Sequence, residues 1–178
     1  MPNFTNNWAD VFKKSIDQMK PLAGTKLDYL EIGIFEGQSA YMMFNNILTH
    51  PDCTYTGIDD WSSSKNHFGE TSETLARKNL KPYKNATIIT DRSRHTLEQF
   101  NKDQRSFDIT YIDGNHSYQG VLSDTVLTWN MTKQIMIWDD YRNNNYGVKP
   151  AVRAFLRNFP NQYKVIVDDY QFAIQKLE

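Results

Sequence analysis

The chain has few of the features that mark secreted or membrane-spanning proteins. Its 178 residues include a single cysteine, Cys53, so no disulfide can form within the chain. No apolar run approaches the roughly 20 residues that a transmembrane helix needs. The first residues, MPNFTNNWADVFKK, lack the apolar centre of a signal peptide. We therefore expect a cytoplasmic protein with no membrane partner.

The sequence also lacks an excess of charge of either sign. Its 20 basic and 21 acidic residues give a formal net charge of −1, which provides little attraction for nucleic acid or an anionic membrane. We find no basic stripe along any expected element, no internal repeat and no linker. These absences predict one domain over residues 1–178, a small-molecule or glycan partner and no nucleic-acid partner, and they leave the oligomeric state open.

Two glycines four positions apart follow the first apolar run, in the segment LDYLEIGIFEGQS at residues 27–39. The pattern predicts a buried strand, a tight turn at Gly33 and Gly37, and a helix whose first N–H groups face a ligand. For so short a motif, a plain turn is the alternative. Glu31 favours the ligand, because a carboxylate at the end of a buried strand needs a partner, and the ammonium group of a cofactor would supply one.

Apolar runs alternate with helical patterns along the chain. Such alternation predicts a parallel sheet with helices on both faces. The last two strands are separated by three residues, too few for a parallel crossover, so they form a hairpin. Residues 1–24 make a helical extension packed on the core, with a lid over the cofactor or an oligomer contact as the alternatives, and residues 62–72 make a loop. The expected strands are 26–35, 54–59, 86–90, 107–112, 133–138, 163–167 and 171–176, and the expected helices 8–19, 38–48, 73–80, 95–101, 118–129 and 148–159.

The glycine segment resembles the first motif of class I S-adenosylmethionine-dependent methyltransferases, with Phe35 where a third glycine is usual. The terminal hairpin is similar to the end of their sheet. The resemblance covers nearly the whole chain from residue 27 onward. It implies an α/β, Rossmann-like three-layer sandwich with strand order 3-2-1-4-5-7-6 and strand seven antiparallel. It also implies that S-adenosyl-L-methionine is bound at Glu31, Gly33, Phe35, Gly37 and Ser39.

Polar residues also end the second and third strands, on the same edge of the expected sheet. Asp59 suits two ribose hydroxyls as hydrogen-bond acceptor, and a cap on the following turn is its alternative. Trp61 would stack on adenine or pack in the core. The family commonly meets its cofactor at these strand ends. The resemblance therefore adds Asp59, Asp60, Trp61, Asp91, Arg92 and Asp113 to the expected cofactor-binding residues.

Three carboxylates end the fourth and fifth strands, which are neighbours about 4.8 Å apart in the expected order. They belong to Asp113 and the pair Asp139-Asp140. A divalent cation such as Mg²⁺ or Mn²⁺ would relieve their repulsion, although Asp-Gly and Asp-Asp are also ordinary turn sequences. The segments FDITYIDGNHSY and IMIWDDY resemble metal-dependent O-methyltransferases that act on sugars. The resemblance implies that these three residues hold the metal.

His116 follows Asp113 by three residues and lies on the same edge. Its near-neutral pKa suits proton removal, and a purely structural histidine is the alternative. The sequence therefore predicts an S-adenosylmethionine-dependent, Mg²⁺- or Mn²⁺-dependent O-methyltransferase acting on a sugar, glycan or other small molecule, with His116 or Asp113 as the base. A nucleic-acid methyltransferase and an inactive methyltransferase-like interaction module are the alternatives.

Overall fold

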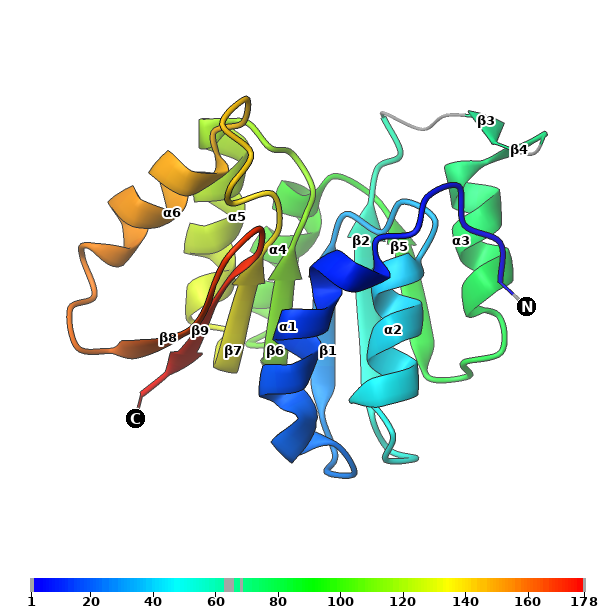
Figure 1. Cartoon of the computed structure of the whole chain (residues 1–178), viewed down its shortest axis with the longest axis horizontal. Helices are drawn as coiled ribbons and strands as arrows, with labels where there is room; N and C mark the ends of the chain where they lie inside the picture. The colour runs from blue at the N-terminus through cyan, green and yellow to red at the C-terminus, as the bar shows by residue number, and fades with distance from the viewer. Residues whose placement is uncertain (1, 63–65, 68, 178) are drawn as a thin grey trace.

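The computed structural model describes residues 2–62, 66–67 and 69–177 (Figure 1). Seven strands form one sheet in the order β5-β2-β1-β6-β7-β9-β8. Strand β9 is antiparallel to both of its neighbours, and the remaining pairs are parallel. The predicted order 3-2-1-4-5-7-6 is confirmed. The strands are β1 (Asp28–Ile32), β2 (Thr54–Asp59), β5 (Ala86–Thr90), β6 (Phe107–Ile112), β7 (Thr132–Trp138), β8 (Tyr163–Asp168) and β9 (Phe172–Lys176).

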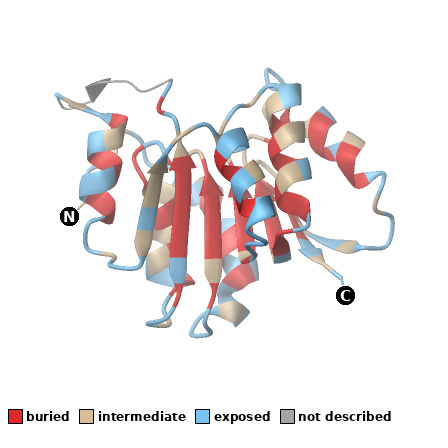
Figure 2. Cartoon of the chain, turned by 180° about the vertical axis from the view of Figure 1, so that it is seen from behind, coloured by how far each residue is buried: buried red, intermediate tan, exposed pale blue. Residues whose placement is uncertain are grey.

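Helices cover both faces of the sheet and make the predicted three layers. On one face, α1 (Ala9–Met19), α2 (Gln38–Asn46) and α3 (Ser72–Leu80) supply side chains to one apolar cluster. On the other face, α4 (Ser93–Lys102), α5 (Tyr118–Trp129) and α6 (Val148–Leu156) supply the second cluster. Figure 2 shows the central strands buried between these layers.

Strand β1 shows how the sequence creates this arrangement. Tyr29 belongs to the cluster under α1 and α2, whereas Leu30 and Ile32 belong to the cluster under α4 to α6. Successive side chains of a strand point to opposite faces, and both faces of a parallel sheet are covered. A nearly continuous apolar run is therefore the expected pattern for this strand.

Several predicted boundaries are corrected by the backbone. Strand β1 ends at Ile32 and not at residue 35, because Gly33 takes a φ of +87° and leaves the extended conformation. Pro21 lies in a short 3₁₀ helix, Lys20–Leu22, after α1. The predicted loop 62–72 contains two short antiparallel strands, β3 (Asn66–His67) and β4 (Glu70–Thr71). Residues 63–65 and 68 of that loop lie outside the described residues.

The expectation that no element carries a basic stripe is also wrong. Lys149, Arg153 and Arg157 recur every four residues along α6 and its C-terminal cap. Positions four apart share a face of a helix, so the three side chains form one row.

No helix in the described part of the chain is long and apolar enough to cross a membrane.

Candidate active site at the carboxyl edge of the sheet

A cavity of about 950 Å³ opens at the carboxyl ends of the parallel strands. Ligands of open α/β sheets bind at this edge. Two predicted residues, Glu31 and Gly37, do not line the cavity. The predicted residues that line it are Gly33, Phe35, Ser39, Asp59, Asp60, Trp61, Asp91, Arg92, Asp113, His116, Asp139 and Asp140.

The loop after β1 is shaped by a close approach to the end of β6. A Cβ added at Gly33 would lie 2.2 Å from the carbonyl oxygen of Asp113, so no side chain fits there. Phe35 has a φ of +51°, in the left-handed region that favours glycine. This conformation gives a physical reason for the glycine that is usual at this position in the methyltransferases that the sequence resembles.

Glu31 is fully buried behind this loop. Its carboxylate accepts hydrogen bonds from the Ser39 hydroxyl and, over 2.6 Å, from the Tyr55 hydroxyl. Burial raises the pKa of Glu31 to about 8, although these two hydrogen bonds oppose the shift. Glu31 therefore ties the first turn of α2 to the sheet. Its contact with a cofactor's ammonium group stays a prediction.

Asp59 holds the same loop from the end of β2. Its Oδ2 accepts the backbone N–H groups of Ile34 and Phe35 at 2.8 and 2.9 Å, and its Oδ1 accepts the N–H of Trp61 at 2.8 Å. Since a carboxylate offers about four acceptor positions, most of its capacity is used within the protein. The capping alternative is therefore present, and the ribose contact stays a prediction.

The other predicted cofactor residues surround Asp59. The indole N–H of Trp61 donates to the carbonyl of Phe35 at 3.2 Å, which fixes its ring at the cavity wall. The Asp60 carboxylate lies 4.0 Å from Arg92. The Asp91 N–H donates to the carbonyl of Asp59 at 3.2 Å. The ends of β2 and β5 are thus joined at the cavity, as a site shared between them requires.

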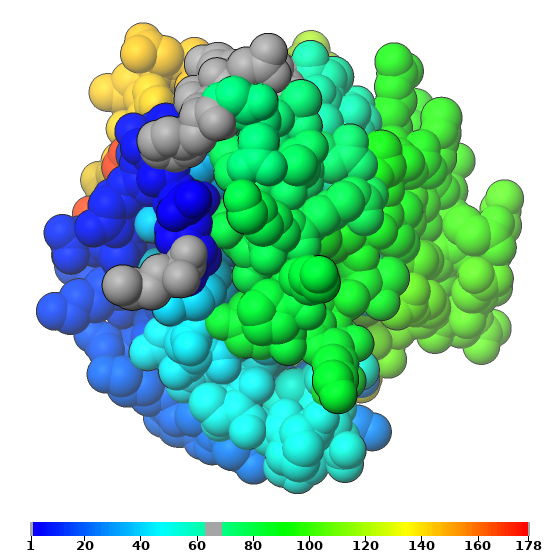
Figure 3. Space-filling view, turned by 90° about the vertical axis from the view of Figure 1, so that its right-hand side faces the viewer, coloured from blue at the N-terminus to red at the C-terminus, as the bar shows by residue number. Residues whose placement is uncertain are grey.

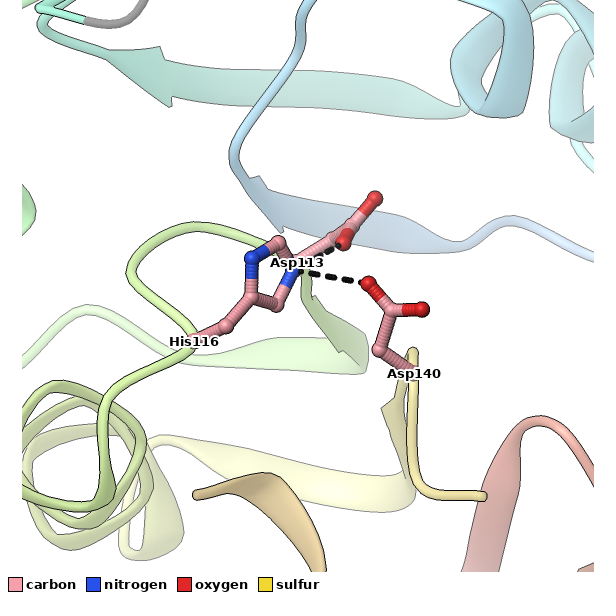
Figure 4. A group of neighbouring side chains, drawn as sticks. All are labelled: Asp113, His116 and Asp140. Carbon is pink, nitrogen blue, oxygen red and sulfur yellow. Dashed lines mark hydrogen bonds and ion pairs between the residues drawn. The ribbon is translucent and has the colours of Figure 1, made fainter. Parts of the chain in front are cut away.

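Asp113, His116 and Asp140 converge on one point of the cavity (Figure 4). The His116 Nε2 lies 3.0 Å from Asp113 Oδ1 and 3.2 Å from Asp140 Oδ2. Burial lowers the pKa of His116, but the hydrogen bond to Asp113 and the neighbouring carboxylate charges outweigh it and raise the pKa overall. The three residues each offer one ligand atom, all within 4.8 Å of one another. Carboxylate and imidazole donors at this separation fit a divalent cation.

Asp139 stands apart from this group. Its Oδ1 is buried and has no hydrogen-bond partner among the described residues. Burial raises the pKa of Asp139 to about 8, and the charges of Asp113 and Asp140 add to the shift. The structure thus brings Asp113 and Asp140 together as predicted, with His116 and not Asp139 as the third donor in reach. The metal-ligand role of Asp139 stays a prediction.

Two residues of the β8–β9 turn belong to the site although the sequence indicated only a hairpin there. The Tyr170 hydroxyl donates to Asp140 Oδ1. Gln171 donates to the hydroxyl of Tyr111 at 3.3 Å, which in turn donates to Asp113 Oδ2 at 3.4 Å. Because β9 lies beside β7, the turn before β9 reaches the cavity. The predicted strand order already implied this position, so it could have been used to predict that Tyr170 and Gln171 lie at the site.

Two tyrosines of the segment after β7 have different positions. Tyr146 stacks on His116, with ring centroids 4.6 Å apart and planes within 11°, and is partly exposed. Tyr141 is buried and stacks on Phe172. Only Tyr146 is placed to meet a substrate beside His116.

The N-terminal extension forms another side of the cavity, through residues that include Trp8 and Phe12. The Trp8 N–H donates to Gln38 Oε1 at 2.9 Å, and the Thr5 N–H donates to the buried Glu36 at 2.6 Å. Figure 3 shows the blue N-terminal segment against the cyan and green surfaces of α2 and α3. The extension is therefore fastened to the glycine loop. Nothing in the sequence pattern beyond its amphipathic helix indicated this contact.

Comparisons with solved structures show the same fold. An O-methyltransferase from Bacillus cereus, in complex with SAH, has a TM-score of 0.71 at 13% identity over 98% of this chain and 84% of its own. A putative O-methyltransferase from Klebsiella pneumoniae has a TM-score of 0.69 at 14% identity over 99% and 84%. An rRNA methylase from Streptococcus thermophilus has a TM-score of 0.64 at 8% identity over 99% and 100%.

A sequence comparison identifies the family. No curated protein sequence matches the chain. The sequence model of a family described as a methyltransferase domain matches residues 30–141. This range is more than half of the chain, and it runs from the glycine loop to the acidic residues after β7. The chain therefore belongs to this family of methyltransferase domains.

Proposed function

We propose that this protein transfers the methyl group of S-adenosyl-L-methionine to a hydroxyl oxygen of a sugar, glycan or other small molecule, with the aid of Mg²⁺ or Mn²⁺. One observation carries the proposal. The Asp113–His116–Asp140 group opens into the same cavity as the glycine loop, so a cofactor and a cation-bound acceptor would meet there. The likeness to an O-methyltransferase in complex with SAH supports the choice of cofactor.

The cavity has the size and lining that the cofactor requires. Its volume of about 950 Å³ lies at the upper end of the usual range for ligand sites. Polar groups that follow β2, β5, β6 and β7 face it, together with the ring of Trp61. The residues proposed to hold the cofactor directly are Gly33, Phe35, Ser39, Asp59, Asp60, Trp61, Asp91, Arg92 and Asp113, with Glu31 and Gly37 shaping the loop behind them.

The carboxylates after β6 and β7 suit a cation. Asp113 and Asp140 both lie within about 3 Å of one imidazole nitrogen, and Asp139 adds a buried oxygen without a partner among the described residues. Like charges this close are costly to bury unless they are paired. We propose Asp113, Asp139 and Asp140 as ligands, with His116 as the competing third donor.

The residues of the chain then have separate tasks. When bound, the cofactor supplies an electrophilic methyl group and the cation lowers the pKa of the acceptor hydroxyl. His116, stacked on the Tyr146 ring, takes the hydroxyl proton at Nε2 when that nitrogen carries no proton for the two carboxylates beside it, and Asp113 is the alternative base. The cavity walls hold acceptor and cofactor in reacting geometry, which supplies much of the rate.

The test combines cofactor binding with turnover. SAH (S-adenosylhomocysteine, the demethylated cofactor) should bind in calorimetry. In a screen of sugars and phenols, the protein should consume S-adenosylmethionine when Mn²⁺ is present, and the consumption should stop when a chelator is added. Under the proposal, Asp139→Asn weakens Mn²⁺ binding, whereas His116→Ala keeps it and loses rate. The reverse pattern would make His116 the third ligand. His50→Ala, in the loop between α2 and β2 and outside the cavity, serves as the control. Full activity with chelator would contradict metal dependence.

A nucleic-acid methyltransferase is the second candidate, because an rRNA methylase shares the fold and α6 carries a basic row. This candidate would be supported if the protein retained an oligonucleotide and if that retention fell steeply as the salt concentration was raised. Failure of SAH to bind would instead favour an inactive interaction module.

A cytoplasmic location stays a prediction.

A further inference from the structure

A second, smaller groove lies between the start of α5 and the outer face of α6, two helices that stand side by side in Figure 1. Its volume is about 400 Å³. Its walls are Tyr118, Lys149, Pro150, Arg153, Ala154 and Arg157. Three of these six side chains are cationic and none is acidic, and their carbon chains make the groove surface itself mostly apolar, so an anion would meet the cations at its rim.

The cations of the groove are available for a ligand. Lys149, Arg153 and Arg157 take part in no ion pair within the part of the chain that the structure describes. A row of three unpaired cations costs electrostatic free energy, and an anionic ligand would recover it.

Two of the cations are held in position by a buried ring. Arg153 Nε donates to the hydroxyl of Tyr141 at 3.1 Å, and Lys149 Nζ lies 5.6 Å from the centre of the same ring. Tyr141 is itself only 3% exposed. One of the five N–H donors of Arg153 is thus used, and the others stay free for a ligand. Cations that are already oriented lose less entropy when they bind.

The groove adjoins the candidate active site. Tyr118, with its side chain partly exposed, begins α5 two residues after His116. The Gly147 N–H, at the start of α6, donates to the carbonyl of His116 at 2.8 Å. A Cβ on Gly147 would lie 2.2 Å from the Tyr118 nitrogen, so the two helix starts are in direct contact. The groove and the candidate site therefore meet where the backbones of the two helix starts touch.

The charges around the groove favour a small phosphate group over a nucleic-acid strand. The row from Lys149 to Arg157 spans about 12 Å along the helix. The neighbouring cavity is lined by Asp59, Asp60, Asp91, Asp113, Asp139 and Asp140. A strand that followed the row into the active site would bring its phosphates against these carboxylates, whereas one phosphate or diphosphate confined to the groove would not.

We propose that the groove between Tyr118 and the Lys149–Arg153–Arg157 row binds a phosphate or diphosphate group of the methyl acceptor, with the Tyr118 ring packing on the adjoining sugar or base. The inference deepens the proposed function, on which it rests, because it names the acceptor as phosphorylated. Arginine and lysine side chains provide the charge-assisted hydrogen bonds that phosphate oxygens accept.

The test uses inorganic pyrophosphate as the probe, in calorimetry with the full chain. Pyrophosphate should bind the wild type, and the Lys149→Gln/Arg157→Gln double variant should lose about tenfold in affinity or more. The matched control is Lys81→Gln/Lys84→Gln, which removes two exposed positive charges far from the groove and should bind as the wild type does. Affinity should fall as salt is raised.

SAH binding, measured in parallel, separates this inference from the proposed function. Normal SAH binding without pyrophosphate binding would overturn the phosphate site alone, and loss of SAH binding with pyrophosphate bound would overturn only the proposed function. An equal loss of pyrophosphate affinity in both double variants would also overturn the site, because it would show a general charge effect. Binding of a 12-residue RNA oligonucleotide but not of pyrophosphate would overturn it in favour of a polymer surface.

Discussion

The backbone N–H of Phe35 donates to the Asp59 carboxylate over 2.9 Å, and this bond joins the loop after β1 to the end of β2. Phe35 is also the residue of that loop that takes a left-handed conformation without being glycine. The carboxylate therefore holds in place a turn whose backbone conformation is unfavourable for the phenylalanine that occupies it. Several consequences can be measured.

Asp59→Asn is expected to destabilise the fold and to weaken SAH binding. An amide oxygen cannot replace two carboxylate oxygens that together accept three N–H groups. Leaving a buried donor unsatisfied costs about 1–3 kcal/mol. Urea unfolding and calorimetry measure the two effects. Asp52→Asn, at an exposed position that does not line the cavity, is the control. Equal losses in both variants would contradict the loop-holding role.

Phe35→Gly should be more stable than Phe35→Ala. Both variants remove the ring, but only glycine removes the Cβ that makes a φ of +51° unfavourable. The left-handed conformation costs about 1–2 kcal/mol for a residue with a Cβ, which the glycine variant avoids. The unfolded chain gains freedom with glycine, and this lowers the stability of the glycine variant by about 0.5–1 kcal/mol. We expect a difference of about 0.5–1 kcal/mol in the free energy of unfolding. Equal stability would show that the loop relaxes.

Gly33→Ala should destabilise the protein more than Gly24→Ala. Both glycines have a φ above +80°, but a Cβ at Gly33 would meet the Asp113 carbonyl at 2.2 Å, whereas Gly24 has open space. The backbone strain is therefore shared, and the clash adds about 1–3 kcal/mol at Gly33 alone. Denaturant unfolding measures the difference. Loss of SAH binding by Gly33→Ala at unchanged stability would indicate contact with the ligand instead of packing.

The stability difference between the wild type and Asp124→Asn should depend on pH. Burial raises the pKa of Asp124 to about 6, and the Ser93 hydrogen bond only partly opposes it. The folded protein therefore holds this proton more tightly than the unfolded chain, with its usual value near 3.9. Wild-type stability should fall relative to the variant as pH rises from about 4 to 6, by roughly 3 kcal/mol, and level off above. A constant difference between pH 4 and 7 would contradict this.

Asp139→Asn should stabilise the protein in the presence of a chelator. Asp139 has a buried oxygen without a partner among the described residues, and Asp113 and Asp140 lie beside it. At pH 9, above the pKa of about 8, Asp139 is charged, and removing one of three mutually repelling charges then favours the fold when no cation is bound. Thermal unfolding with chelator measures the effect, and the exposed Asp52→Asn is the control. If Asp139 is a ligand, added Mn²⁺ should raise the melting temperature of the wild type more than that of the variant.

The sequence by itself determined the alternation of strands and helices, the terminal hairpin and the edge that carries the site, and its resemblance to the methyltransferases implied the strand order. The period of the apolar residues is a local property, and three residues between the last two strands permit only a hairpin. The polar residues that end the strands are adjacent to them in sequence. Asp113 and Asp140 were therefore predicted together, because neighbouring strands must bring their ends together.

Only the tertiary structure decided what each side chain does at that edge. Glu31 faces Ser39 and Tyr55, Asp59 faces the loop, and His116 reaches Asp140 where Asp139 does not. A strand end places a residue within a few ångströms of a site but does not set the direction of its side chain. Tyr170 reaches Asp140 from 30 positions away, and the row on α6 faces a groove only because α6 packs beside α5. Contacts between residues distant in sequence depend on how the layers pack, and no local pattern encodes them.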